Sequence, residues 1–314
     1  MVHEKYSDIK FSPTNCLICE QDDTELLSVQ DNLFRIVRCK RCGLSYQNPR
    51  PSEESLPLLY SDDKYFCNPQ IGYDNYVKTY FDYQDLFEKL FSERLKLIHK
   101  FKKTGNLLEI GCAHGFHLEF LRRAGFDTKG VEFSESPFKY ARDILHLDVF
   151  HGTLENSPFE IGSFDLILML DIIEHLPDIP GTLDKVKKLL KPDGLILVQV
   201  PWELFHWEKR LEAFFAGKKT GTIRPDAIPV HLYFFTPETL IKVLEKNGFR
   251  IISRESGNYG RIRSKIMPSI PLTSDFKRSI LMKFYYRSFS RSIMRKIAPL
   301  IKKGSGIILF GVKI

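Results

Sequence analysis

A short apolar run followed by two glycines occupies residues 107–115, whose sequence is LLEIGCAHG. Such a run predicts a buried strand and a tight turn, and the amphipathic stretch 114–125 predicts a helix directly after it. The same alternation continues along the chain, with further strands predicted at 129–133, 148–151, 164–170, 195–200, 249–253 and 307–312. Strand and helix repeats of this size predict an α/β fold, in which helices cover both faces of a largely parallel sheet.

Ligands of an open parallel sheet bind at the carboxyl ends of its strands, so the residues there are the first candidates for a site. Gly111 and Gly115 follow the first predicted strand, where glycine lets the backbone approach a ligand closely. Glu132 ends the second predicted strand, 21 residues after Gly111, where a carboxylate can bind both hydroxyls of a ribose. The G-x-x-x-G spacing differs from the G-x-G-x-x-G of dinucleotide sites, so a nicotinamide cofactor is not expected.

Four segments together resemble the motif series of class I S-adenosylmethionine (SAM)-dependent methyltransferases, and they occupy residues 108–115, 130–132, 164–167 and 190–194. The resemblance covers residues 105–256 and implies that the chain is a SAM-dependent methyltransferase. It also implies a Rossmann-like seven-stranded sheet in the order 3-2-1-4-5-7-6, with the last strand antiparallel to its neighbours.

The same resemblance assigns roles in SAM binding to residues at the strand ends. Gly111, Ala113 and Gly115 would line the methionine part of SAM, and Glu132 would bind the ribose. Residues 153–154 would flank the adenine. Ala113 stands where the motif more often has glycine, and alanine should be tolerated there if the backbone conformation is ordinary. The predicted cofactor-binding residues are Glu109, Gly111, Ala113, Gly115, Glu132, Thr153, Leu154 and Asp171.

The sequence DIIEH at 171–175 follows the fourth predicted strand and places a carboxylate beside an imidazole. In a helix, Asp171, Glu174 and His175 would share one face, and a carboxylate can raise the basicity of a nearby imidazole. SAM is already activated, so methyl transfer to a hydroxyl needs positioning and a base. By resemblance to sugar C-methyltransferases, we predict that His175 is the base and Glu174 its partner. Two alternatives are a structural pair and, by resemblance to small-RNA methyltransferases, a divalent-metal site that includes His231.

Four of the six cysteines form two C-x2-C pairs, Cys16 with Cys19 and Cys39 with Cys42. The polar N-terminal segment has no signal core, and in such a chain paired C-x2-C motifs indicate a metal rather than disulfides. Four thiolates complete the tetrahedral shell of Zn²⁺, which predicts a structural zinc ribbon, with iron as the alternative. With the NPRP sequence at 48–51, this module resembles that of a bacterial methyltransferase subgroup in sugar and polysaccharide pathways.

The predicted organisation is a zinc ribbon over 1–50, a linker with N-terminal helices over 51–104 and a methyltransferase domain over 105–314. Two long segments interrupt that domain. The aromatic-rich segment 202–230 predicts a lid over the acceptor, with a packed surface helix as the alternative. The segment 261–303 carries a charge of +11, while the rest of the chain carries −4. A basic amphipathic helix can lie on an anionic membrane, so one interpretation of this segment is peripheral membrane contact. The alternatives are a helix with a solvated charged face and contact with nucleic acid.

These observations favour SAM-dependent methyl transfer to a hydroxyl or carbon of a sugar, glycan or related small molecule. One alternative is an RNA methyltransferase, but five basic residues in 12–50 are matched by five acidic ones, so nucleic acid is not the expected partner. The other alternative is a non-catalytic protein that binds partners through the SAM fold. A membrane-spanning helix needs about 20 apolar residues in a row, which the sequence lacks, so we expect a cytoplasmic protein. The oligomeric state stays open.

Overall fold

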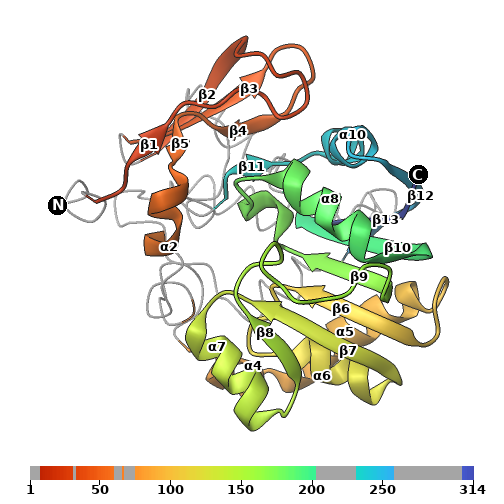
Figure 1. Ribbon diagram of the computed structural model, residues 1–314. Helices are drawn as coiled ribbons and strands as arrows, with labels where there is room; N and C mark the ends of the chain where they lie inside the picture. Colours follow the sequence, from red (N-terminus) through yellow and green to blue (C-terminus); the bar gives the residue numbers. More distant parts are fainter. Residues whose placement is uncertain (1–7, 31–32, 60–65, 67–74, 203–230, 258–305) are drawn as a thin grey trace, which may run out of the picture.

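The computed structural model describes residues 8–30, 33–59, 66, 75–202, 231–257 and 306–314. A seven-stranded sheet forms its centre, in the order β12-β13-β10-β9-β6-β7-β8 (Figure 1). Its strands are β6 (Gly105–Ile110), β7 (Phe126–Glu132), β8 (Asp148–His151), β9 (Phe164–Leu170), β10 (Leu190–Pro201), β12 (Phe249–Gly257) and β13 (Gly306–Lys313). Read from β8, this is the predicted order 3-2-1-4-5-7-6, and β13 runs antiparallel to both β10 and β12. The predicted fold class is confirmed.

Helices cover both faces of this sheet, because alternate residues of its strands point to opposite sides. Residues of α8 (Ile179–Leu189) and α10 (Pro237–Lys246) pack with Leu108 and Ile167 in one apolar cluster. On the other face, residues of α5 (Gln84–Ile98) and α6 (Phe116–Arg123) pack with Leu107 and Leu166. The remaining helices are α4 (Tyr76–Asp82), α7 (Glu135–Lys139), a π-helical turn at Tyr140–Ile144 and α2 (Leu56–Leu59) with a 3-10 turn at Glu53–Ser55.

The N-terminal part forms a second sheet, in the order β11-β4-β3-β2. Three of its strands come from the cysteine-rich segment, namely β2 (Thr24–Gln30), β3 (Phe34–Cys39) and β4 (Ser45–Gln47). The fourth strand, β11 (Tyr233–Phe234), comes from the second half of the chain and pairs with β4. A two-stranded sheet of β1 (Phe11–Ser12) and β5 (Arg50–Pro51) lies beside them (Figure 1).

Some sequence expectations differ from the structure or lie outside it. The N-terminal helices predicted within 51–104 include α4 and α5, which are separated by a break at Tyr83. The turn predicted at 191–194 lies inside β10, as an irregularity in its pairing with β9. The basic segment 261–303 and all of the predicted lid except Trp202 lie outside the described residues. Within the described part, no helix is long and apolar enough to cross a membrane.

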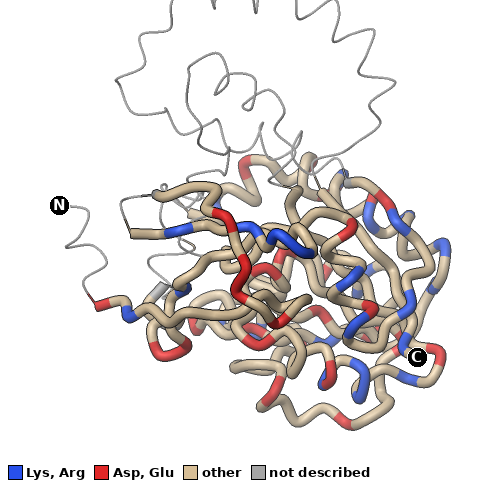
Figure 2. Tube along the Cα trace, turned by 90° about the horizontal axis from the view of Figure 1, so that it is seen from above, with Lys and Arg blue, Asp and Glu red and all other residues tan. Residues whose placement is uncertain are grey.

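Acidic and basic residues are interspersed along the described chain, as Figure 2 shows. Several form ion pairs within one helix, such as Asp184 with Lys188 and Glu135 with Lys139. These groups are exposed, and exposed pairs of this kind contribute little to stability. The fold therefore rests on the two apolar clusters that flank the sheet, and these clusters fix the strand ends at which the site lies.

Candidate functional site

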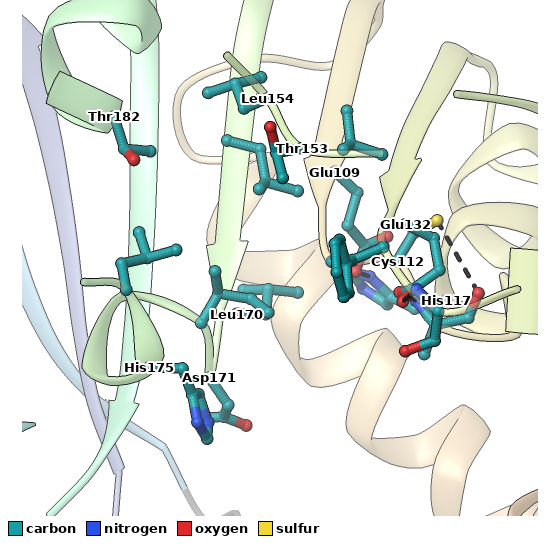
Figure 3. A pocket seen from close by; sticks show the side chains of 18 of the residues that line it. Glu109, Cys112, His117, Glu132, Thr153, Leu154, Leu170, Asp171, His175 and Thr182 are labelled. Carbon is teal, nitrogen blue, oxygen red and sulfur yellow. Dashed lines mark hydrogen bonds and ion pairs between the residues drawn. The ribbon is translucent and has the colours of Figure 1, made fainter. Parts of the chain in front are cut away.

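A cavity of about 550 Å³ opens at the carboxyl ends of four neighbouring strands, β6, β7, β8 and β9 (Figure 3). Parallel strands bring these ends to one edge of the sheet, where a ligand site is expected. Most of the predicted site residues line this cavity, namely Glu109, Gly111, Ala113, Glu132, Thr153, Leu154, Asp171 and His175. Gly115 and Glu174 are not among the lining residues.

The loop between β6 and α6 is held in an unusual backbone conformation. Gly111, Ala113 and Gly115 all have a positive φ, of 69°, 49° and 80° respectively. The backbone at Ala113 is therefore not ordinary, and a left-handed alanine costs about 1–2 kcal/mol. A Cβ atom at Gly115 would lie 2.6 Å from Cδ1 of Leu147, so this glycine allows α6 to pack closely. Its absence from the cavity wall follows from that packing.

Glu132 ends β7 and ties this loop to the cavity wall. One carboxylate oxygen accepts a hydrogen bond from the Ala113 N–H at 2.8 Å, and the other accepts one from the Ser134 N–H at 2.8 Å. Burial raises the pKa of Glu132, although these two donors oppose the shift. The Ser134 side chain and the Phe133 N–H also lower this pKa, and the carboxylate that these groups hold lines the cavity. This geometry fits the predicted role in binding a ribose.

Arg94 is a site residue that the sequence analysis missed. It lies on α5, is only 6% exposed, and lines the cavity beside Glu109. Its Nη2 donates to Oε1 of Gln199 at 3.1 Å, and Nε2 of Gln199 donates to Asp171 at 3.2 Å. The helical spacing of the buried residues Phe87, Leu90, Phe91, Arg94 and Ile98 could have revealed it, since a charge then falls on an apolar face.

Two buried charged groups in this wall keep hydrogen-bonding capacity. Within the described residues, Nε of Arg94 and Oε2 of Glu109 have no hydrogen-bond partner. The other oxygen of Glu109 lies 2.9 Å from Nδ1 of His117. A buried charge with an unsatisfied atom is costly unless a ligand completes it. A guanidinium and a carboxylate at one cavity wall match the carboxylate and the ammonium of an amino acid, and SAM carries both groups.

The segment after β9 is a 3-10 turn at Ile173–His175 rather than the helix on which the shared face was predicted. Asp171 precedes this turn with a φ of 56°, and lines the cavity together with His175. The distance from Nε2 of His175 to Oε1 of Glu174 is 4.0 Å, which is an ion-pair distance and longer than a hydrogen bond. The ring of His231 lies perpendicular to that of His175, with 4.5 Å between the centroids.

These three side chains form a compact group beside the cavity. Ligand atoms of Glu174, His175 and His231 all lie within 4.8 Å of one another. The structure thus brings together both residues of the base prediction and three of the four residues of the alternative metal prediction, in which Asp171 was the fourth. Glu174 and His175 are buried, with 1% and 8% of their surfaces exposed.

The four cysteines predicted to bind a metal converge in the N-terminal part of the chain. Sulfur atoms of Cys16, Cys19, Cys39 and Cys42 lie within 4.8 Å of one another, with 3.4 Å between Cys16 and Cys42. Two sulfurs on one tetrahedral Zn²⁺ lie roughly 3.8 Å apart, so the arrangement fits such an ion. Burial raises the pKa of the Cys39 thiol, but N–H groups of Cys42 and Arg41 and the neighbouring thiols bring it down to about 7. A thiolate in such a cluster is a ligand for a soft cation.

Comparisons with known proteins identify a methyltransferase domain in this chain. A family model described as a methyltransferase domain matches residues 83–254. The ubiquinone biosynthesis O-methyltransferase of Colwellia psychrerythraea is 27% identical over 164 residues, which cover 50% of this chain and 65% of that enzyme. The same enzyme of Vibrio atlanticus is 25% identical over 187 residues, which cover 55% of this chain and 77% of that enzyme.

A solved SAM-dependent methyltransferase from Archaeoglobus fulgidus is also similar, with a TM-score of 0.47 and 19% identity over 72% of this chain and 94% of that one. The family match spans more than half of the chain, and the strand order is the one that the motifs predicted. The cysteine-rich module lies outside the matched region. This chain therefore belongs to the methyltransferase-domain family, and its sheet has the strand order of class I SAM-dependent methyltransferases.

Proposed function

We propose that this protein transfers the methyl group of SAM to a hydroxyl of a small acceptor, with a sugar or sugar-containing molecule as the first candidate. The observation that carries the proposal is His175, a buried imidazole that lines the cavity beside Asp171 and has Glu174 at an ion-pair distance. Phenols are the second candidate class, because the relatives described above are named as ubiquinone biosynthesis O-methyltransferases.

The cavity residues fit SAM by their chemistry. Arg94 would bind the carboxylate of its methionine part, and Glu109 would bind the ammonium. Glu132 would accept hydrogen bonds from the ribose hydroxyls, and the segment 153–154 after β8 would flank the adenine. SAM supplies an activated methyl group on a sulfonium, so the protein itself needs to orient the acceptor and remove a proton.

His175 would act as the general base in its neutral form. It takes the acceptor's hydroxyl proton while the acceptor oxygen forms a bond to the methyl carbon and the bond from sulfur to that carbon breaks. The products are the methylated acceptor and S-adenosylhomocysteine. The imidazolium that forms is stabilised by Glu174, whose carboxylate lies 4.0 Å away. Base catalysis of this kind typically contributes about 10²–10⁴-fold to the rate.

The four-cysteine cluster would hold one structural Zn²⁺, because four converging sulfurs complete its preferred shell. The proposed organisation keeps the zinc ribbon at 1–50 and the methyltransferase domain at 105–314. Peripheral membrane contact through 261–303 and the cytoplasmic location stay predictions.

A panel of acceptors with radiolabelled SAM tests the function. The panel has three arms, which are nucleotide sugars, catechols and structured RNA. His175→Ala should lower turnover by about 10²–10⁴-fold with SAM affinity unchanged, because base catalysis acts in the transition state. The exposed histidine variant His146→Asn is the matched control and should keep full turnover.

The outcomes separate the alternatives. Full activity of a folded His175→Ala protein would refute the base role. Loss of activity with EDTA, and equal damage from His231→Ala, would favour the metal site instead. Label transferred only to RNA would replace the small acceptor by RNA. SAM binding without turnover on any arm would favour a non-catalytic protein.

A further inference from the structure

Strand β11 connects the cysteine-rich module to the group formed by Glu174, His175 and His231, here called the catalytic group. Its residues Tyr233 and Phe234 pair with Tyr46 and Ser45 of β4, which directly follows the second cysteine pair. All four of these residues are nearly or fully buried. His231 lies two residues before β11 along the chain. The module therefore packs against the segment that carries one histidine of the catalytic group.

Gln47 contacts the segment 231–232 through both its side chain and its backbone. It ends β4, is completely buried, and donates its side-chain Nε2–H to the carbonyl oxygen of His231 at 2.7 Å. Its backbone N–H donates to the carbonyl oxygen of Leu232 at 2.9 Å. From the opposite side, the N–H of Leu232 donates to the carbonyl oxygen of Glu174 at 2.9 Å. The segment 231–232 is thus held between Gln47 and the 3-10 turn of the catalytic group.

This arrangement links the position of Gln47 to the environment of His175. The ring of His231 packs edge-on against the ring of His175, with 4.5 Å between the centroids. A shift of the 231–232 segment would therefore change the packing of the imidazole proposed as the base. Small errors in the position of a reacting group are costly in catalysis.

We infer that Gln47 is a positioning residue for methyl transfer, which holds His231 against His175 through its side-chain amide. The inference rests on the proposed role of His175 as the base. It gives the cysteine-rich module a function in the reaction, since β4 is the strand through which that module reaches the catalytic group.

The other contacts of β11 make this inference testable. Arg50 donates to the hydroxyl of Tyr233 at 2.9 Å, and the β4–β11 pairing does not involve the Gln47 side chain. Gln47→Met keeps the size of the side chain and removes its donor, so β11 should stay in place while His231 loses one contact. Ser45→Ala is the matched control, because Ser45 is equally buried on the same strand and its hydroxyl has no hydrogen-bond partner within the described residues.

The first measurement needs no acceptor. Protein with ¹³C-labelled histidine is titrated by NMR in the presence of S-adenosylhomocysteine, and the signals of His175 and His231 are assigned from their Ala variants. Gln47→Met should shift both signals and the titration midpoint of His175, with the melting temperature and the affinity for S-adenosylhomocysteine equal to those of Ser45→Ala. Unchanged signals would overturn the inference. If Gln47→Met does not fold, Gln47→Leu, which also lacks the donor, takes its place.

The second measurement uses the panel acceptor that the wild-type protein methylates fastest. Gln47→Met should lower kcat roughly tenfold with KM nearly unchanged, because misplacement acts on the chemical step. In a His231→Ala background the same change should have no further effect, and an additive loss would overturn the inference. A wild-type protein that methylates nothing on the panel would refute the proposed function, while the NMR result would still decide whether Gln47 positions the two histidines.

Discussion

Replacing Arg94 by methionine should weaken SAM binding. Methionine nearly fills the space of the arginine stem but has no charge and no N–H donor. A hydrogen bond to a charged group is worth about 1.5–3 kcal/mol, and each 1.4 kcal/mol is a factor of ten, so the Kd for SAM should rise about 10–150-fold. This cost falls on binding because Nε of Arg94 has no partner within the described residues. Loss of the hydrogen bond to Gln199 should in addition lower the stability by about 1–3 kcal/mol.

Calorimetry with three ligands tests this reasoning. SAM and S-adenosylhomocysteine both carry the methionine carboxylate, whereas 5′-methylthioadenosine carries only the nucleoside part. Arg94→Met should weaken the first two and leave the third unchanged. Arg123→Met is the matched control, since Arg123 lies exposed on α6 and pairs with Glu88 and Glu119. An equal loss for 5′-methylthioadenosine, or no loss for S-adenosylhomocysteine, would refute the assignment of Arg94 to the carboxylate.

Glu132→Ala should raise the Kd for SAM by roughly tenfold or more, since charge-assisted hydrogen bonds to the ribose are lost; unchanged affinity in calorimetry would remove Glu132 from the site. Elemental analysis should find one zinc per chain, and chelation should unfold the N-terminal module; metal retained by the double variant Cys16→Ser, Cys39→Ser would contradict the four-sulfur site. Ala113→Gly should stabilise the protein by up to about 1 kcal/mol, because relief of the left-handed backbone exceeds the entropy that glycine adds to the unfolded chain. Urea unfolding measures this change, and a clear loss of stability would show that the φ of Ala113 carries no strain.

Local patterns in the sequence were enough to predict the architecture of the central sheet. Periodicity located the strands of the central sheet and most of its helices, because a buried strand needs an apolar run and a surface helix needs an apolar stripe. The glycines after the first strand and the acid after the second indicated a ligand site, since parallel strands bring their carboxyl ends to one edge. The spacing of the four cysteines likewise predicted that their sulfurs would meet.

The tertiary structure decided what depends on contacts between distant parts of the chain. Arg94 became a site residue because α5 packs its charged side chain against the cavity. Its place on the apolar stripe of α5 indicates burial, but only the fold shows which cavity it meets. The left-handed Ala113 and the 3-10 turn at 173–175 are imposed by their surroundings rather than by residue type. The contact between Gln47 and His231 joins residues that are 184 positions apart. Local sequence cannot specify such a pairing, because a two-residue strand has too few side chains to select its partner, and only packing of the whole chain does so.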